Sequence, residues 1–90
     1  MTVECFIWTN HAEERRAERL FDRPDVERAI RAGHADRRIN HGEADWRVHG
    51  LTIDGRRFAA LYDHPCRADD KTVLVVNVLD APSPARRRVS

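Results

Sequence analysis

The segment Thr72–Leu79 restricts the possible folds of this chain more than any other part of its sequence. It reads T-V-L-V-V-N-V-L, an almost unbroken run of β-branched and aliphatic residues. Such a run is typical of a strand that is buried on both faces. A buried strand needs neighbouring strands to pair its backbone N–H and C=O groups, so the chain must build a sheet. Its 90 residues suffice for one small domain around that sheet.

The other strong strand signals follow Gly33. Residues Trp46–Ile53 alternate between apolar and polar side chains, and Asp54-Gly55 is a typical hairpin turn. We therefore expect an antiparallel meander with strands at Arg37–His41, Trp46–Ile53, Arg57–Tyr62 and Thr72–Leu79. The apolar run Val3–Trp8 is either a first strand or an extended lead-in.

Two helices are expected before Gly33. Asn10 is the predicted N-cap of the first helix, whose inner face is expected to hold Ala12, Leu20 and the stem of Arg16. Asp22 is the predicted N-cap of the second helix. Val26, Ala29 and Ile30 recur at the spacing of a buried helical stripe. Pro24 is tolerated in the first turn of this helix, and Gly33 is its predicted C′ residue.

These signals predict an α+β fold. Two N-terminal helices are packed on a three- to four-stranded antiparallel β-meander. The predicted domain spans residues 1–81, and a flexible basic tail follows at residues 82–90.

The charges of the chain almost cancel. It has 16 Lys and Arg against 15 Asp and Glu, which gives a formal net charge of +1. Three of the arginines, Arg86, Arg87 and Arg88, belong to the tail, so the body has 13 basic against 15 acidic residues and a charge of −2. A balanced charge gives no general preference for nucleic acid. An RNA-binding protein of this composition needs either its positive groups gathered on one face or the Arg86–Arg88 tail.

The sequence also excludes several classes of protein. No apolar segment approaches the roughly 18 residues of a membrane span, and Met1–Trp8 lacks the pattern of a signal peptide, so we expect a cytoplasmic protein with no membrane partner. Cys5 and Cys66 are too few for a disulfide framework. His64 and Cys66 have no third ligand at metal spacing, even with Cys5, so we predict no metal and no cofactor.

The first candidate site lies on the first predicted helix. His11, Arg15 and Arg19 recur at i, i+4 and i+8, which places an imidazole and two guanidiniums on one helical stripe. The helix dipole disfavours an imidazolium in the first turn, so His11 has the properties of a general base beside a phosphate-binding group. The alternative is a solvated face whose arginines form ion pairs with neighbouring glutamates.

The second candidate site lies on the predicted sheet. Arg47 and His49 share one face of their strand, opposite Trp46 and Val48. We expect the same site to include Arg57, just past the hairpin turn, together with Tyr62 and Asn77. The alternatives are an ordinary solvent face for Arg47 and His49 and, for Asn77, hydrogen bonds to the neighbouring backbone. We expect His34 and His41 at the surface.

Residues 9–33 resemble the start of a family of small bacterial domains, domain-of-unknown-function family 4258. The family pattern is H-A-x-x-R-x-x-x-R, followed by an N-cap and a second helix that contains the dipeptide D-V. The residues of this chain that match it are His11, Ala12, Arg15, Arg19, Asp22, Asp25 and Val26. The later segments Trp46–Gly50, Gly55–Arg57 and Val75–Val78 fit the same layout. This family is similar to a large group that contains RelE toxins, barnase, EndoU and the colicin tRNase domains.

The resemblance implies a RelE-like fold and a metal-independent ribonuclease toxin. In that reaction the ribose 2′-hydroxyl attacks its own phosphate, with a base, an acid and cations assisting. On this analogy His11 is base or acid, Arg15 and Arg47 hold the phosphate, and His49 or Tyr62 completes proton transfer; Arg19, Arg57 and Asn77 bind RNA beside them. The implied partners are mRNA or tRNA and an antitoxin or immunity protein. The alternative is a non-catalytic module of the same fold that binds protein or RNA.

Overall fold

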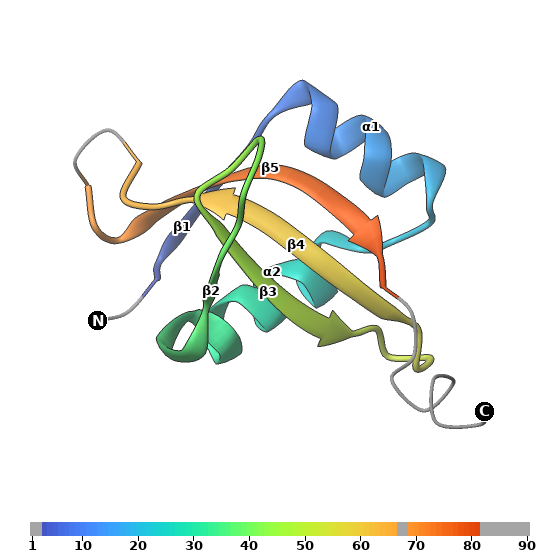
Figure 1. The fold of residues 1–90 in the computed structure, drawn as a ribbon. Helices are drawn as coiled ribbons and strands as arrows, with labels where there is room; N and C mark the ends of the chain where they lie inside the picture. Colours follow the sequence, from blue (N-terminus) through green and yellow to red (C-terminus); the bar gives the residue numbers. More distant parts are fainter. Residues whose placement is uncertain (1–2, 67–68, 82–90) are drawn as a thin grey trace.

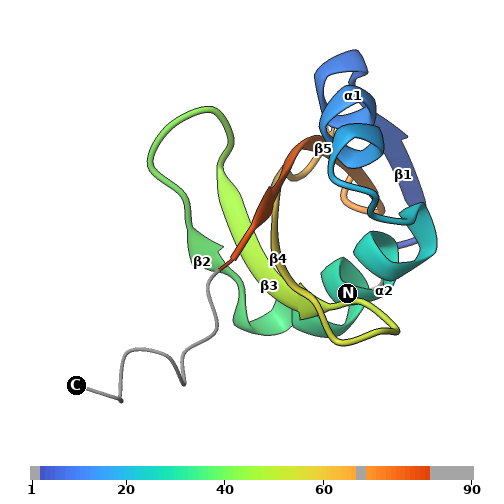
Figure 2. The same ribbon diagram turned by 90° about the vertical axis from the view of Figure 1, so that its right-hand side faces the viewer.

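Five strands form one sheet, and both helices lie against the same face of it (Figures 1 and 2). The computed structural model describes residues 3–66 and 69–81, so the predicted tail at 82–90 lies outside the described residues. The elements, in chain order, are β1 (Cys5–Trp8), α1 (Asn10–Glu18), α2 (Arg23–Gly33), a 3₁₀ turn (His34–Asp36), β2 (Arg38–Ile39), β3 (Trp46–Leu51), β4 (Arg57–Asp63) and β5 (Thr72–Asp80).

The predicted antiparallel meander of three or four strands is wrong, because the sheet is mixed. Its order is β1-β5-β4-β3-β2, and β1 runs parallel to β5 from the Cys5–Thr72 pair to the Trp8–Val75 pair. The remaining neighbours are antiparallel, as expected. The α+β class and the two helices of the prediction agree with the structure. The prediction failed at Val3–Trp8, because the pairing of this segment depends on where β5, far along the chain, lies in the sheet.

β1 lies at the edge of the sheet, and its side chains alternate between exposed and partly buried. Phe6 and Trp8 pack against the core under the helices, whereas Cys5 and Ile7 are exposed. A parallel partner needs a long crossover connection, and the two helices with the meander supply one here. β5, with β1 on one side and β4 on the other, is the buried strand that its β-branched run predicted.

The ends of α1 differ from the prediction. Its N-cap is Thr9, whose hydroxyl accepts a hydrogen bond from the Ala12 backbone N–H, and Asn10 is already helical. Leu20 does not close the inner face: it adopts a left-handed conformation with φ 60° and is 80% exposed. The reversal turns the next residue inward, so Phe21 takes the buried position.

α2 packs directly over β3. Val26 and Ile30 enter the core as their spacing predicts, and Asp22 is the N-cap. A Cβ atom placed on Gly50 of β3 would lie 2.5 Å from the Ala29 Cβ, so this close approach requires a glycine. Gly33 is not a left-handed C′ residue, because its φ is −98° and the chain continues into the 3₁₀ turn.

A β-bulge sets the faces of β5. Leu61 pairs with Asn77, but the next residue of β4, Tyr62, pairs with Val75. Val76 is therefore the extra residue of the bulge, which lets Val75 and Val78 both face the helices while Asn77 faces the other way. Among the described helices, neither has the length and apolar character needed to cross a membrane.

Candidate functional site

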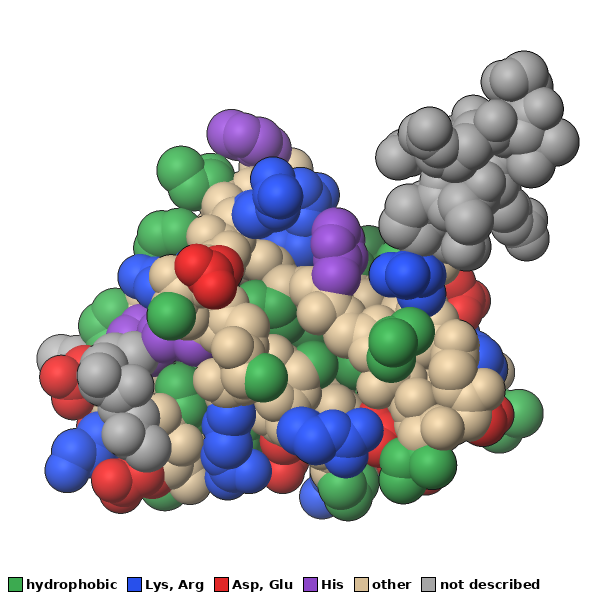
Figure 3. All heavy atoms as spheres, turned by 90° about the horizontal axis from the view of Figure 1, so that it is seen from below, with side chains coloured by type: hydrophobic (Ala, Val, Ile, Leu, Met, Phe, Trp, Pro, Cys, Tyr) green, Lys and Arg blue, Asp and Glu red, His purple; other side chains and the backbone are tan. Residues whose placement is uncertain are grey.

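Four basic side chains lie on the outer face of the sheet, the face opposite the helices. Arg47 and His49 alternate with the core residue Val48 along β3, so both point outward. Arg38 of β2 pairs directly with Arg47, and Arg57 of β4 lies diagonally from His49, next to its partner Ala59. We call Arg38, Arg47, His49 and Arg57 the Arg/His cluster. Figure 3 shows basic (blue) and histidine (purple) side chains among those in the upper half of that view.

The three arginines of the cluster have no acidic partner in the described part of the chain. Most of the other described arginines form ion pairs, such as Arg28 with Asp25 at 2.8 Å and Arg56 with Asp80 at 3.2 Å. Arg31 and Arg37 instead donate to backbone carbonyl groups. Within residues 3–66 and 69–81, none of the three cluster arginines lies within ion-pair distance of a carboxylate. Arg38 and Arg47 are directly opposite on neighbouring strands, and like charges in such a pair destabilise the sheet. A bound anion would relieve this repulsion.

The surroundings of His49 favour the neutral form of its imidazole. The pKa of His49 lies below its ordinary value, mainly because partial burial disfavours the charged form and also because Arg47, Arg38 and Arg57 repel a further positive charge. A neutral imidazole among guanidiniums can accept a proton while its neighbours hold an anion. This combination is what general base chemistry on a phosphodiester requires.

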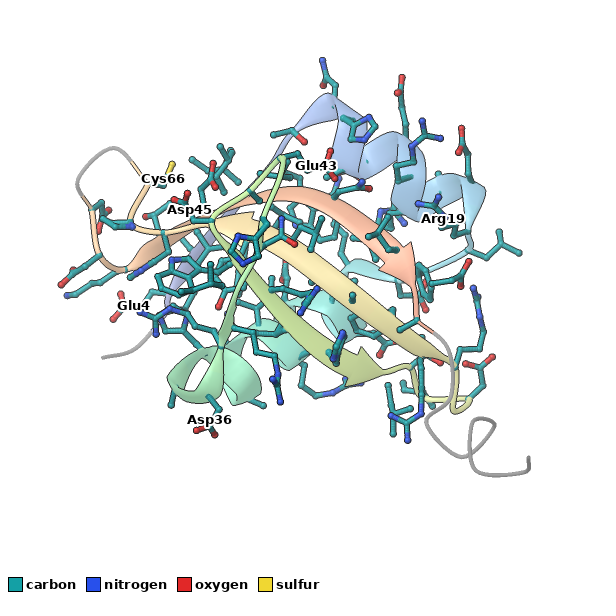
Figure 4. All side chains as sticks on the ribbon, in the orientation of Figure 1. Glu4, Arg19, Asp36, Glu43, Asp45 and Cys66 are labelled. Atoms are coloured by element: carbon teal, nitrogen blue, oxygen red, sulfur yellow. The ribbon has the colours of Figure 1, made fainter. Side chains whose placement is uncertain are left out.

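A shallow hollow of about 200 Å³ lies at the cluster. It is lined by Gly33, Asp36, Arg38, Arg47, Val48 and His49. The Nε of Arg47 is buried there without a hydrogen-bond partner in the described residues. Asp36 contributes the single carboxylate of the lining, and Figure 4 shows it below the 3₁₀ turn, pointing away from the sheet. The hollow is therefore lined by the guanidiniums of Arg38 and Arg47, and one N–H donor of Arg47 has no partner among the described residues.

The predicted stripe on α1 does not join this cluster. His11 is exposed in the first turn of α1, which packs against β5, two strands away from β3. Arg15 pairs with Glu18 at 2.6 Å, as the alternative interpretation of this face expected. Arg19 donates to the Val78 carbonyl at 2.7 Å and lies beside Asp80, next to the end of β5 (Figure 4). Arg15 and Arg19 are thus engaged locally.

Asn77 faces outward but is covered. The loop at residues 40–45 crosses the outer face, and its Glu43 accepts a hydrogen bond of 2.6 Å from the Asn77 side chain (Figure 4). The side-chain Oδ1 of Asn77 accepts a hydrogen bond from the Val78 backbone N–H at 2.8 Å, so the local hydrogen bond expected as the alternative for this residue is partly present. Asn77 holds the loop against the sheet and has little left for a ligand.

Tyr62 lies on the other face from His49. It points under the helices, fully buried, and its hydroxyl is 2.7 Å from the Nδ1 of His34. Burial raises the pKa of Tyr62 to about 12. The sequence did carry a signal for this placement: Arg57 and Tyr62 are five residues apart on one strand, and an odd spacing puts them on opposite faces.

Two histidines show what the sequence-based reasoning missed. His41 is exposed, as expected, but His34 is 5% exposed and its ring lies 4.6 Å from the His64 ring. No pattern indicated this burial, because the 3₁₀ turn that carries His34 folds onto β4. Arg38 was missed as a cluster member for a related reason: only its pairing with Arg47 reveals it.

The comparisons with known proteins supply no relative. No family model, no curated protein and no solved structure matches this chain. The family resemblance therefore rests on the matching sequence segments alone. Among the described side chains, no three of His, Cys, Asp and Glu are grouped closely enough to hold a metal ion.

Proposed function

We propose that this protein binds RNA at the Arg/His cluster and cleaves it by attack of a ribose 2′-hydroxyl on the adjacent phosphate. The observation that carries the proposal is the cluster itself. Three guanidiniums without ion pairs among the described residues surround an imidazole whose pKa is lowered. The positive groups that a body of almost balanced charge needs for RNA thus meet on one face.

The chemistry follows from the positions of these groups. His49 accepts the proton of the 2′-hydroxyl as its oxygen bonds to phosphorus, and the bond from phosphorus to the 5′-oxygen breaks. The leaving 5′-oxygen takes up a proton from a solvent water, and a 2′,3′-cyclic phosphate remains. Arg47, with Arg38 and Arg57 around it, stabilises the negative charge of the pentavalent phosphorane.

The proposed biological role of this reaction rests on the family resemblance of residues 9–33. It supports a metal-independent toxin that acts on mRNA or tRNA in the bacterial cytoplasm and is controlled by an antitoxin or immunity protein. Induced expression tests this setting. Growth arrest that His49→Gln relieves supports it, and normal growth with well-expressed protein contradicts it.

A non-catalytic RNA-binding module is the second candidate. It is favoured by the positions of His11 and Tyr62, which were expected to take part in proton transfer with His49, because neither shares the outer face with His49. In this case the cluster holds RNA phosphates but no bond is broken.

A cleavage assay with a labelled RNA oligonucleotide, in the presence of EDTA, separates the candidates. We expect cleavage to a cyclic phosphate, no cleavage where the ribose is 2′-deoxy, and a rate lower by about 10²- to 10⁴-fold in His49→Gln. His11→Gln serves as the control and should retain the rate. Binding without cleavage establishes the second candidate, and neither binding nor cleavage rejects both.

A further inference from the structure

The outer edge of β3 is unpaired over most of its length. β2 covers it only at the pairs Ile39–Trp46 and Arg38–Arg47. Beyond Arg47, within the described chain, no strand lies beside Val48–Leu51 on that side. Such an edge presents free backbone donors and acceptors to a further strand.

The hydrogen-bond pattern identifies which backbone groups are free. Asn40 donates its N–H to the Asp45 carbonyl at 2.9 Å across the β2–β3 pair. Antiparallel strands alternate with a period of two, so the backbone groups of Arg47, His49 and Leu51 point to the same side as those of Asp45. The N–H and C=O groups of His49 and Leu51 are therefore directed outward, where β2 no longer reaches.

The two sides of this edge differ in chemistry. Toward the helices, a groove of about 330 Å³ runs along the β3 edge beside α2, and its α2 side is lined by Ala29, Ala32 and Gly33 together with Arg28. On the outer face, the same edge is flanked by the Arg/His cluster. At the end away from β2, the apolar side chains of Leu51 and Ile53 are 50% and 85% exposed.

We propose that the β3 edge binds an extended acidic segment of a protein partner, which adds to the sheet as a sixth strand. Side chains of a strand alternate between its two faces. The bound segment therefore has small apolar residues opposite Val48 and Gly50, toward α2, and carboxylates opposite His49 and Leu51, toward the Arg/His cluster. Backbone pairing supplies affinity, and the alternation supplies specificity.

A second copy of this chain does not fit the same edge. Pairing two β3 edges antiparallel would bring the outer faces of two copies, each with the arginines of the Arg/His cluster, side by side. Like charges on neighbouring strands repel. The charge of the edge thus selects an acidic partner over self-association.

A synthetic peptide tests the proposal on the unmodified protein. The probe is fluorescein-labelled Ala-Glu-Val-Glu-Val-Glu-Ala with blocked ends, measured by fluorescence anisotropy at low salt. We expect saturable binding, and binding at least about tenfold weaker for the same composition in the order Ala-Val-Val-Glu-Glu-Glu-Ala. No binding of the alternating peptide, or equal binding of the two, overturns the proposal.

Backbone methylation separates strand pairing from attraction between charges alone. One peptide series carries N-methyl groups on the glutamates and the other on the valines, so each blocks one edge of the peptide. We expect one series to lose about tenfold or more in affinity and the other to retain it. The glutamate series is affected if the added strand is antiparallel, and the valine series if it is parallel. Equal binding by both series means that the cluster attracts any polyanion, as an oligonucleotide would, and overturns the proposal.

A pair of variants supplies the matching test from the protein side. Leu51→Pro removes an N–H that points away from β4, so the native ladder is kept while the outer edge is blocked. Leu51→Thr retains that N–H and serves as the control. We expect Leu51→Pro to weaken peptide binding about tenfold and Leu51→Thr to change it little. Circular dichroism verifies that both variants are folded, and equal affinities of the two for the peptide contradict the proposal.

Discussion

The Nδ1 of His34 lies 2.7 Å from the hydroxyl oxygen of Tyr62, and both side chains are buried on the helix face of the sheet. This contact joins the 3₁₀ turn after α2 to the middle of the sheet. The Nε2 of His34 is buried without a hydrogen-bond partner in the described residues. The pair is thus a structural contact on the opposite face from His49, and it has consequences for stability that can be measured.

We predict that stability falls as the pH falls below neutrality because of His34. Burial first, and then the positive charges of Arg37 and His64, lower the pKa of His34 from its ordinary 6.5 to about 4. The unfolded chain therefore takes up this proton before the folded protein does, so the stabilisation is complete above pH 6.5 and is lost as the pH approaches 4. The expected loss of unfolding free energy between pH 8 and pH 5 is about 2 kcal/mol.

The measurement is urea denaturation at a series of pH values. His34→Gln keeps a group that can hydrogen-bond Tyr62 but does not titrate, and it serves as the control. The difference between the two pH profiles isolates His34 from His49, whose lowered pKa contributes with the same sign. Parallel profiles for the two proteins would show that His34 is not the cause.

Tyr62→Phe should lower stability without affecting cleavage, whereas His49→Gln should lower cleavage without affecting stability. Tyr62→Phe leaves the buried Nδ1 of His34 without its partner, so the free energy of unfolding should fall by about 1–3 kcal/mol while RNA cleavage is retained. His49→Gln changes a side chain that is largely exposed and only partly buried, so cleavage should fall with little change in stability. Denaturation and cleavage are measured on the same preparations. Loss of cleavage in folded Tyr62→Phe contradicts the placement of the site on the outer face.

Gly50→Ala should destabilise the packing of α2 on β3. The added methyl would lie 2.5 Å from the Ala29 Cβ and 2.8 Å from the Phe58 ring, so the elements must move apart. The expected cost is about 1–3 kcal/mol, measured by thermal or urea denaturation. Combining it with Ala29→Gly removes one of the two clashes, so the double variant should be less destabilised than the sum of the singles. Simple additivity would indicate that Ala29 is not the obstacle.

RNA binding should depend on salt through the Arg/His cluster. Each of Arg38→Gln, Arg47→Gln and Arg57→Gln should weaken binding and reduce the slope of log K against log salt by about 0.7 for each RNA phosphate that the variant no longer neutralises. Arg15→Gln is the control, because it makes the same change of charge at an arginine that pairs with Glu18. Titrations with a labelled oligonucleotide at several salt concentrations give these slopes. An equal effect of Arg15→Gln would mean that only the total charge matters.

Local patterns were sufficient for most of the elements. The spacing of Val26 and Ile30 predicted their burial, and the alternation around Val48 predicted that Arg47 and His49 share the outer face. These predictions succeed because the period of a helix or strand is a property of the local backbone. The same rule, applied to the odd spacing of Arg57 and Tyr62, separates those two residues.

Pairings between distant segments were not contained in any local pattern. The parallel pairing of β1 with β5 depends on a return of the chain across more than 60 residues, and the bulge at Val76 depends on how β5 meets β4. Arg38 joins the Arg/His cluster through a two-residue strand, and His34 is buried because a 3₁₀ turn packs on Tyr62.

The sequence by itself thus determined the class of the fold, the order of its helices and meander strands, and which residues of β3 share a face. Only the tertiary structure decided the mixed sheet, the gathering of cations around His49, the burial of His34 and the unpaired edge of β3. The physical reason is that periodicity is read from neighbours along the chain. Strand partners and unmatched charges arise from surfaces that meet only when the chain has folded.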